Sequence, residues 1–160
     1  MLPVAEYMAT LPRKRMAASA IIRNAAGEIL LVKPTYRPDW LMPGGTIEAD
    51  ESPRAACKRE VLEEIGLDLL IGPLLSLEYQ PQNGDRTEAL MFTFDGGVLS
   101  EKQIAAIQLP TDELSAVQFL SLDAALPLFA VRMHQRTRAA LSALAKGTVV
   151  YLEDRRKTVD

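Results

Sequence analysis

The chain has 160 residues, a formal net charge of −3, 48% hydrophobic residues and 24% charged residues. This length and composition predict a single soluble globular domain with a core of its own. The slightly acidic balance argues against nucleic acid as the main partner, and the single cysteine, Cys57, excludes an internal disulfide and fits a cytoplasmic location. No apolar run approaches the roughly 20 residues that would cross a membrane.

The first segment, residues 1–15, is expected to be an arm outside the domain. Pro3 and Pro12 interrupt it, and it ends in a short basic patch. We expect this arm to be solvated or to contact a second copy of the chain, so a homodimer remains an open alternative. The folded domain is expected over residues 16–153, with a polar tail at 154–160.

Two strands are predicted at residues 17–23 and 28–33, because both segments are rich in Ile, Leu and Val. Residues 24–27 between them form a predicted hairpin turn. An irregular loop at 33–41 follows and leads into a glycine turn, Pro43-Gly44-Gly45. We expect the Trp40 side chain in this loop to pack in the interior.

A helix is predicted after this turn. Asp50 or Ser52 is suited to cap its N-terminus, Pro53 suits the first turn, and Gly66 ends it. Cys57 falls on the apolar side of this helix. We therefore interpret it as a core residue and not as a nucleophile.

The opposite side of the same helix is acidic. Glu60, Glu63 and Glu64 stand at i, i+3 and i+4 and share one face. Like charges at this spacing cost roughly 0.2–0.5 kcal/mol per pair, and the helix dipole disfavours anions in the last turn. Because a hard divalent cation such as Mg²⁺ would turn this repulsion into attraction, the pattern favours a metal platform.

The remainder of the chain alternates further strands with short helices. The predictions, in order, are a long or broken strand at 68–80, a strand at 87–95 that Gly96-Gly97 ends, a short helix or loop at 101–111, a strand at 117–120, helices at 122–129 and 132–146, and a last strand at 148–152. This order predicts an α+β fold with a mixed β-sheet.

The segment from Gly45 to Leu67 carries a specific spacing of residues. It reads Gly45-x5-Glu51-x7-Arg59-Glu60-Val61-x-Glu63-Glu64-x-Gly66-Leu67, with nine defined positions over 23 residues. Every one of them matches the Nudix box, so the chain resembles the Nudix hydrolases, the MutT-like family. The resemblance implies the Nudix fold, an α/β/α sandwich around a mixed sheet.

The resemblance also implies roles for individual residues. The metal ligands would be the carbonyl of Gly44 and the carboxylates of Glu60, Glu63 and Glu64, holding Mg²⁺ or alternatively Mn²⁺. Arg59 would orient a box glutamate, and Glu51 would support the loop.

The general base stays open at this point. Some members of the family use a box glutamate, which would be Glu60 in this chain, and others use a carboxylate from a later loop. Glu113 is the candidate of the second kind, with Glu88 and Asp112 as rivals.

The implied function is metal-dependent cleavage of the pyrophosphate linkage of a nucleoside diphosphate joined to another moiety, as in a nucleotide, a nucleotide sugar or ADP-ribose. Tyr36, Arg37 and Arg86 are the candidates for binding this small molecule. One alternative is a non-hydrolytic regulator that binds a nucleotide, against which the intact box argues. Another is an isomerase acting on isopentenyl diphosphate, for which no catalytic cysteine and histidine metal site can be assigned.

Overall fold

The structure is a computed structural model that describes residues 2–153. It contains one sheet of seven strands. The strands are β1 (Arg15–Arg23), β2 (Ile29–Pro34), β3 (Gly44–Thr46), β4 (Leu74–Gln80), β5 (Ala89–Val98), β6 (Leu114–Leu120) and β7 (Val150–Glu153). The helices are α1 (Val4–Thr10), α2 (Pro53–Ile65), α3 (Glu101–Ala105), α4 (Leu122–Ala125), a 3₁₀ turn η1 (Leu126–Leu128) and α5 (Arg132–Lys146).

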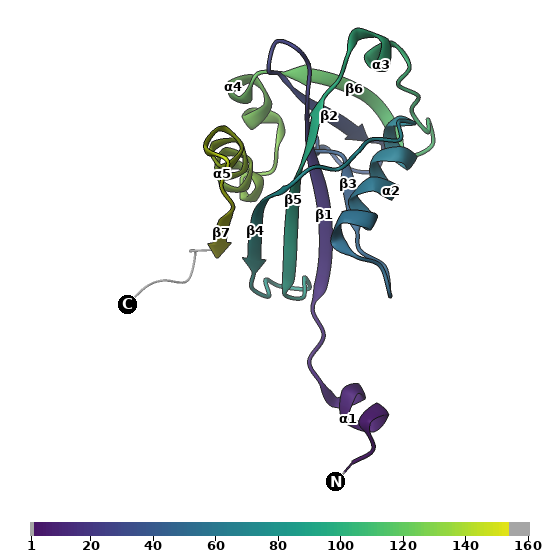
Figure 1. Cartoon of the computed structure of the whole chain (residues 1–160), viewed down its shortest axis with the longest axis vertical. Helices are drawn as coiled ribbons and strands as arrows, with labels where there is room; N and C mark the ends of the chain where they lie inside the picture. Colours follow the sequence, from purple (N-terminus) through teal and green to yellow (C-terminus); the bar gives the residue numbers. More distant parts are fainter. Residues whose placement is uncertain (1, 154–160) are drawn as a thin grey trace.

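The strands lie in the order β6-β2-β1-β5-β4-β7, and β3 pairs with β1 beside this path. The pairs β1–β5 and β4–β7 are parallel, whereas the others are antiparallel. Helix α2 covers one face of the sheet, and α4 and α5 cover the other (Figure 1). The predicted α/β/α sandwich with a mixed sheet is therefore confirmed.

Strand β1 is central because its side chains alternate between two cores. Ala18, Ala20 and Ile22 belong to the core beneath α2, and Ile21 belongs to the core beneath α5. Side chains on successive residues of a strand point to opposite faces. A central strand that is apolar on both sides is what a sheet covered by helices on both faces requires.

Helix α2 begins and ends close to its predicted bounds. The hydroxyl of Ser52 accepts a hydrogen bond from the N–H of Ala55 at 3.2 Å, so Ser52 and not Asp50 caps the helix. Gly66 ends it in the left-handed conformation, with φ 73°. Cys57 is fully buried, as predicted.

The prediction of a turn at Pro43-Gly44-Gly45 is wrong, because Gly44 and Gly45 belong to strand β3. Gly44 has a φ of 144°, and a Cβ there would lie 2.2 Å from the carbonyl oxygen of Ala18. Only glycine allows the two backbones to approach so closely. The strand hence forms where composition suggested a turn.

Two predicted strand bounds also need correction. The segment predicted as strand from residue 68 is strand only from Leu74, after Pro73. Strand β5 does not stop at Gly96-Gly97 but continues to Val98. A Cβ on Gly96 would lie 2.4 Å from Cγ1 of Ile22, so this glycine serves close packing inside the sheet and is no terminator.

The C-terminal half follows the predictions with small shifts. The ambiguous segment after residue 100 contains the short helix α3, and β6 begins three residues earlier than predicted, at Leu114. The predicted helix at 122–129 divides into α4 and the 3₁₀ turn. Helix α5 has its predicted bounds and ends at Gly147, whose φ is 64°.

The N-terminal arm contains a helix, α1, that was not predicted, and none of its residues is buried. Figure 1 shows α1 standing away from the sheet. A homodimer contact through this arm stays a prediction. The predicted tail at 154–160 lies outside the described residues, and among those that are described no helix combines the length and the apolar character needed to cross a membrane.

Candidate active site

The acidic end of α2 packs against β3. The Oε2 atom of Glu64 accepts a hydrogen bond from the N–H of Gly44 at 2.8 Å. A Cβ on Gly45 would lie 2.4 Å from the carboxyl carbon of Glu60. The two glycines thus allow two box carboxylates to approach the backbone of β3. Gly44 donates a hydrogen bond to Glu64, and the absence of a side chain at Gly45 leaves room for Glu60.

Arg59 connects the other carboxylates of this region. Its Nε and Nη2 atoms donate to the two oxygens of Glu51, each at 2.9 Å. Its Nη1 atom donates to Glu60 at 2.8 Å and to Glu63 at 3.2 Å, and Nη2 also donates to the carbonyl of Thr46 at 3.1 Å. The Arg59 guanidinium holds the pKa of Glu51 down to about 2. Such a bidentate pair fixes both orientation and charge.

Glu64 has the opposite electrostatic environment. The pKa of Glu64 is raised to about 8, first by burial and then by the negative charges of Glu60, Glu113 and Glu63, against the lowering effect of the hydrogen bond from Gly44. Desolvation and neighbouring anions both disfavour the charged form of a carboxylic acid. A cation at this position would relieve both costs.

The donor atoms of this cluster fit a hard divalent metal ion. Carboxylate and carbonyl oxygens are the ligands that Mg²⁺ prefers, and burial together with neighbouring glutamates disfavours the ionised form of Glu64, a cost that a bound cation would offset. Within residues 2–153 no three His, Cys, Asp or Glu side chains already form a metal cage. Instead Arg59 engages Glu60 and Glu63, while the Gly44 N–H engages Glu64.

The three loop candidates for a general base lie in different surroundings. Glu113 is near enough to Glu64 for its charge to raise the pKa of that residue. Asp112 is exposed and is not among the groups that shift the pKa of Glu64. Glu88 is engaged in an ion pair with Lys14 at 2.6 Å. Of the three candidates, Glu113 is the one whose charge acts on a glutamate of the box.

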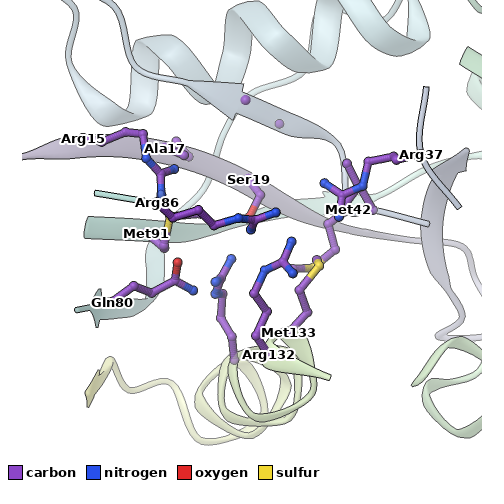
Figure 2. A pocket seen from close by; sticks show the side chains of 15 residues that line it. Arg15, Ala17, Ser19, Arg37, Met42, Gln80, Arg86, Met91, Arg132 and Met133 are labelled. Atoms are coloured by element: carbon purple, nitrogen blue, oxygen red, sulfur yellow. The ribbon is translucent and has the colours of Figure 1, made fainter. Parts of the chain in front are cut away.

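A pocket of about 200 Å³ opens beside Gly44 and Gly45, between β1 and the N-terminal end of α5. Figure 2 shows arginine side chains that extend into it from both sides. Five arginines line it: Arg15, Arg37, Arg86, Arg132 and Arg136.

Two of the three predicted substrate contacts lie in this pocket. Arg37 and Arg86 line it, whereas Tyr36 does not and is 77% exposed. The pKa of Arg132 is lowered by burial and then by the neighbouring guanidinium groups of Arg86, Arg37 and Arg136. The positive charges are hence close enough to repel one another.

The box and the arginine-lined pocket both draw residues from a segment that matches a known family. The family model of the NUDIX domain matches residues 13–142, which is most of the chain. The chain belongs to the Nudix family.

Several known proteins resemble this Nudix protein. It is 35% identical over 82 residues to diphosphoinositol polyphosphate phosphohydrolase 2 of Rattus norvegicus, a match that covers 51% of this chain and 46% of that protein. It therefore spans less than half the length of that curated relative. Among solved structures, the MutT protein of Methanosarcina mazei Go1 superposes with a TM-score of 0.67 at 23% identity, over 86% of this chain and 99% of that chain. An ADP-ribose pyrophosphatase of Streptococcus suis superposes with a TM-score of 0.69 at 22% identity, over 89% and 100%. These two likenesses show the fold.

Sequence reasoning missed part of the pocket of this Nudix protein. Arg15, Arg132 and Arg136 line it beside the two arginines that were proposed. One signal was present, because Arg132 and Arg136 stand at i and i+4 at the start of α5, whose first turn contains no acid. The helix dipole disfavours cations there, in the same way that it disfavours the glutamates at the end of α2.

Proposed function

We propose that this Nudix protein is a Mg²⁺-dependent hydrolase that cleaves a pyrophosphate linkage in a small phosphorylated molecule. The observation that carries the proposal is the cluster of box carboxylates around Gly44 and Gly45, next to a pocket lined by five arginines. One region suits a cation and the other suits an anion. A pyrophosphate with its metal ion needs both.

Four oxygen donors are the proposed metal ligands: the carboxylates of Glu60, Glu63 and Glu64 and the carbonyl of Gly44. The bound ion would polarise phosphoryl oxygens and lower the pKa of a bound water. Arg59 is proposed to orient Glu60 and Glu63, since it donates to both. Mn²⁺ is an alternative ion for the same donors.

Glu113 is proposed as the general base that takes a proton from the attacking water. Its support is its electrostatic proximity to Glu64 and its exposure, which gives water access to the carboxylate. A positioned base contributes about 10²–10⁴-fold to a rate. Glu60 is the alternative, although its Oε1 is already engaged by Arg59 at 2.8 Å.

The substrate follows from the relatives only in outline. Their names include diphosphoinositol polyphosphates and ADP-ribose, and both kinds of molecule contain a pyrophosphate linkage. A nucleoside diphosphate joined to another moiety is the class that the family resemblance favours. We propose as the partner a small molecule with a pyrophosphate linkage, with neither nucleic acid nor a membrane as the main partner.

The test is a hydrolysis screen with and without Mg²⁺. It covers nucleoside triphosphates, ADP-ribose, nucleotide sugars, dinucleoside polyphosphates and diphosphoinositol polyphosphates, and it measures phosphate and pyrophosphate separately. We expect one class to be cleaved only when the metal is present. We expect Glu64→Gln to lower that rate about 10³-fold, because it removes a charged ligand of the ion.

The exposed residue Glu101 at the start of α3 provides a matched control, since Glu101→Gln removes one carboxylate that is not among the groups that shift the pKa of Glu64. Its rate should equal that of the parent chain. Silence of the whole panel, with nucleotide still bound, would favour the non-hydrolytic regulator. Activity of Glu64→Gln with unchanged metal dependence would refute the ligand assignment.

A further inference from the structure

The arginine pocket gathers more positive charge than its carboxylate partners balance. Its five arginines come from four separate segments: β1, the loop before β3, the loop between β4 and β5, and α5. They gather on a chain whose formal net charge is −3. Local concentration of one sign of charge in a concave site selects a ligand of the opposite sign.

Only two of these guanidinium groups have a carboxylate partner among the described residues. Arg37 pairs with Asp39 at 3.0 Å, and Arg136 pairs with Glu78 at 2.6 Å. Within residues 2–153 the other three, Arg15, Arg86 and Arg132, form no ion pair with an acidic side chain. The pocket thus presents a surplus of positive charge.

Arg136, a nearly buried arginine of the pocket, is held in place by an ion pair. Arg136 is 4% exposed, and its partner Glu78 on β4 is 5% exposed. The same Glu78 oxygen accepts a hydrogen bond from the amide of Gln80 at 3.2 Å. An ion pair that is buried in this way fixes the guanidinium plane, so Arg136 is oriented before any ligand arrives.

The rest of the lining is poor in groups that recognise a nucleobase. The lining contains no aromatic side chain, and its only uncharged polar side chains are Ser19 and Gln80. Proteins that hold a base usually stack it on an aromatic ring and read its edge with hydrogen bonds. The apolar residues that remain can cover a carbon ring, but they do not read it; these are Ala17, Ala18, Leu41, Met42, Met91 and Met133.

The pocket adjoins the box at strand β3. Gly44 and Gly45 line the pocket, and the same two residues meet Glu64 and Glu60 of α2. On its outer side a second hollow of about 260 Å³ shares four lining residues with it: Arg15, Gln80, Arg86 and Arg132. A substrate whose pyrophosphate lies beside Gly44 and Gly45 would have the guanidinium groups of this pocket next to it.

We propose that the arginine pocket binds a second cluster of phosphate groups on the substrate, so that the specificity of this protein is for a small polyphosphorylated molecule and not for a nucleobase. This inference rests on the proposed function, because it describes the end of the substrate that is not cleaved. Planar guanidinium groups bind phosphate oxygens in pairs. Arg86 and Arg132, which have no carboxylate partner among residues 2–153, are assigned as the main contacts.

Binding without metal separates this proposal from catalysis. In EDTA, calorimetry would measure the affinities of myo-inositol hexakisphosphate, tripolyphosphate, ATP and ADP-ribose for the full chain. We expect the hexakisphosphate to bind at least about tenfold more tightly than ADP-ribose, because each charge-assisted hydrogen bond contributes that much. ATP and tripolyphosphate share one phosphate chain, and their affinities should agree within about threefold, since the base adds little.

Variants on one helix provide the matched comparison. Arg132→Gln should weaken hexakisphosphate binding about ten- to hundredfold. Arg138→Gln removes the same charge from an exposed position of α5 that does not line the pocket, and it should leave the affinity unchanged. Arg132→Lys keeps the charge without the paired donors, and it should fall between the two.

The outcomes are distinct. Tighter binding of ATP than of tripolyphosphate by tenfold or more would overturn the proposal, because it would show that a base is recognised. Equal losses in Arg132→Gln and Arg138→Gln would also overturn it, because they would reflect net charge alone. If the phosphate-rich probes bind as expected but no compound is hydrolysed with Mg²⁺, the proposed hydrolase function fails while the assignment of the pocket stands.

Discussion

Helix α2 carries negative charge at its C-terminal end and helix α5 carries positive charge at its N-terminal end, and the helix dipole disfavours both arrangements. Glu63 and Glu64 lie in the last turn of α2, where anions are disfavoured, and Arg132 lies in the first turn of α5, where cations are disfavoured. In both places the charged side chains lower the stability of the folded chain. A bound ligand of opposite charge would offset this loss of stability.

The two regions differ in how their charges are balanced without a ligand. In the box, Arg59 pairs with three glutamates, so one positive charge within the chain bridges three of the negative ones. In the pocket, Arg15, Arg86 and Arg132 have no acidic partner among residues 2–153. The ion pairs of Arg59 therefore fix the box side chains without a ligand, whereas the pocket arginines need a bound anion to balance their charge.

The largest expected effect concerns Glu64 and the stability of the metal-free protein. Its pKa is about 8 in the folded chain and 4.5 ordinarily, so between these pH values the folded state binds the extra proton. Stability should then fall as pH rises from 4.5 to 8, by on the order of 4 kcal/mol. Urea unfolding in EDTA at several pH values measures this slope.

Two comparisons isolate the contribution of Glu64 to that slope. Glu64→Gln should flatten the curve between these pH values and should be more stable than the parent chain at pH 8 in EDTA. Mg²⁺ should restore stability to the parent chain at pH 8, because it binds the ionised carboxylate. A parent curve that is already flat in EDTA would show that Glu64 is not protonated in the folded state.

The box was predictable from sequence because its residues are consecutive. One helix with a cap, a stop and an i, i+3, i+4 acidic face specifies its own geometry, so Glu60, Glu63, Glu64 and Arg59 lie together as predicted. The pocket was only partly predictable, because Arg15, Arg86 and Arg132 come from segments that the sheet brings together. Strand β3 escaped prediction because glycine composition indicates a turn, and only the partner strand decides otherwise.

The next largest effect concerns the buried pair beneath the pocket. Glu78→Gln should cost about 3 kcal/mol of stability, because it leaves the charge of Arg136 buried without its partner in a site where both side chains are nearly inaccessible. Urea unfolding measures the loss. Glu78→Met combined with Arg136→Met should cost less than the single change, because neither variant residue carries a charge; an equal or larger loss would assign the cost to packing.

A smaller effect, on rate alone, is expected at the proposed base. Glu113→Gln should lower kcat about a hundredfold with little change in KM, because the carboxylate would act on the attacking water and not on substrate binding. Its neighbour Asp112 is the matched control, and Asp112→Asn should retain the parent rate. If Glu113→Gln keeps kcat within about threefold, the base is Glu60 or another group.

The smallest effect tests whether the close approach of β3 to the box matters for chemistry or only for folding. In Gly45→Ala the new Cβ would meet the Glu60 carboxylate at 2.4–2.6 Å, and that flexible side chain can swing aside at little cost in stability. The hydrogen bond of Glu60 to Arg59 and its proposed place at the metal ion would be lost, so the rate should fall about tenfold or more.

Gly84→Ala provides the contrast, because the φ of 58° at Gly84 strains the backbone while no atom lies within 4 Å of the new Cβ. That variant should lose about 1 kcal/mol of stability and no activity. Should Gly45→Ala instead lose stability and retain its full rate, the glycine would serve packing, and the position of Glu60 would not limit the reaction.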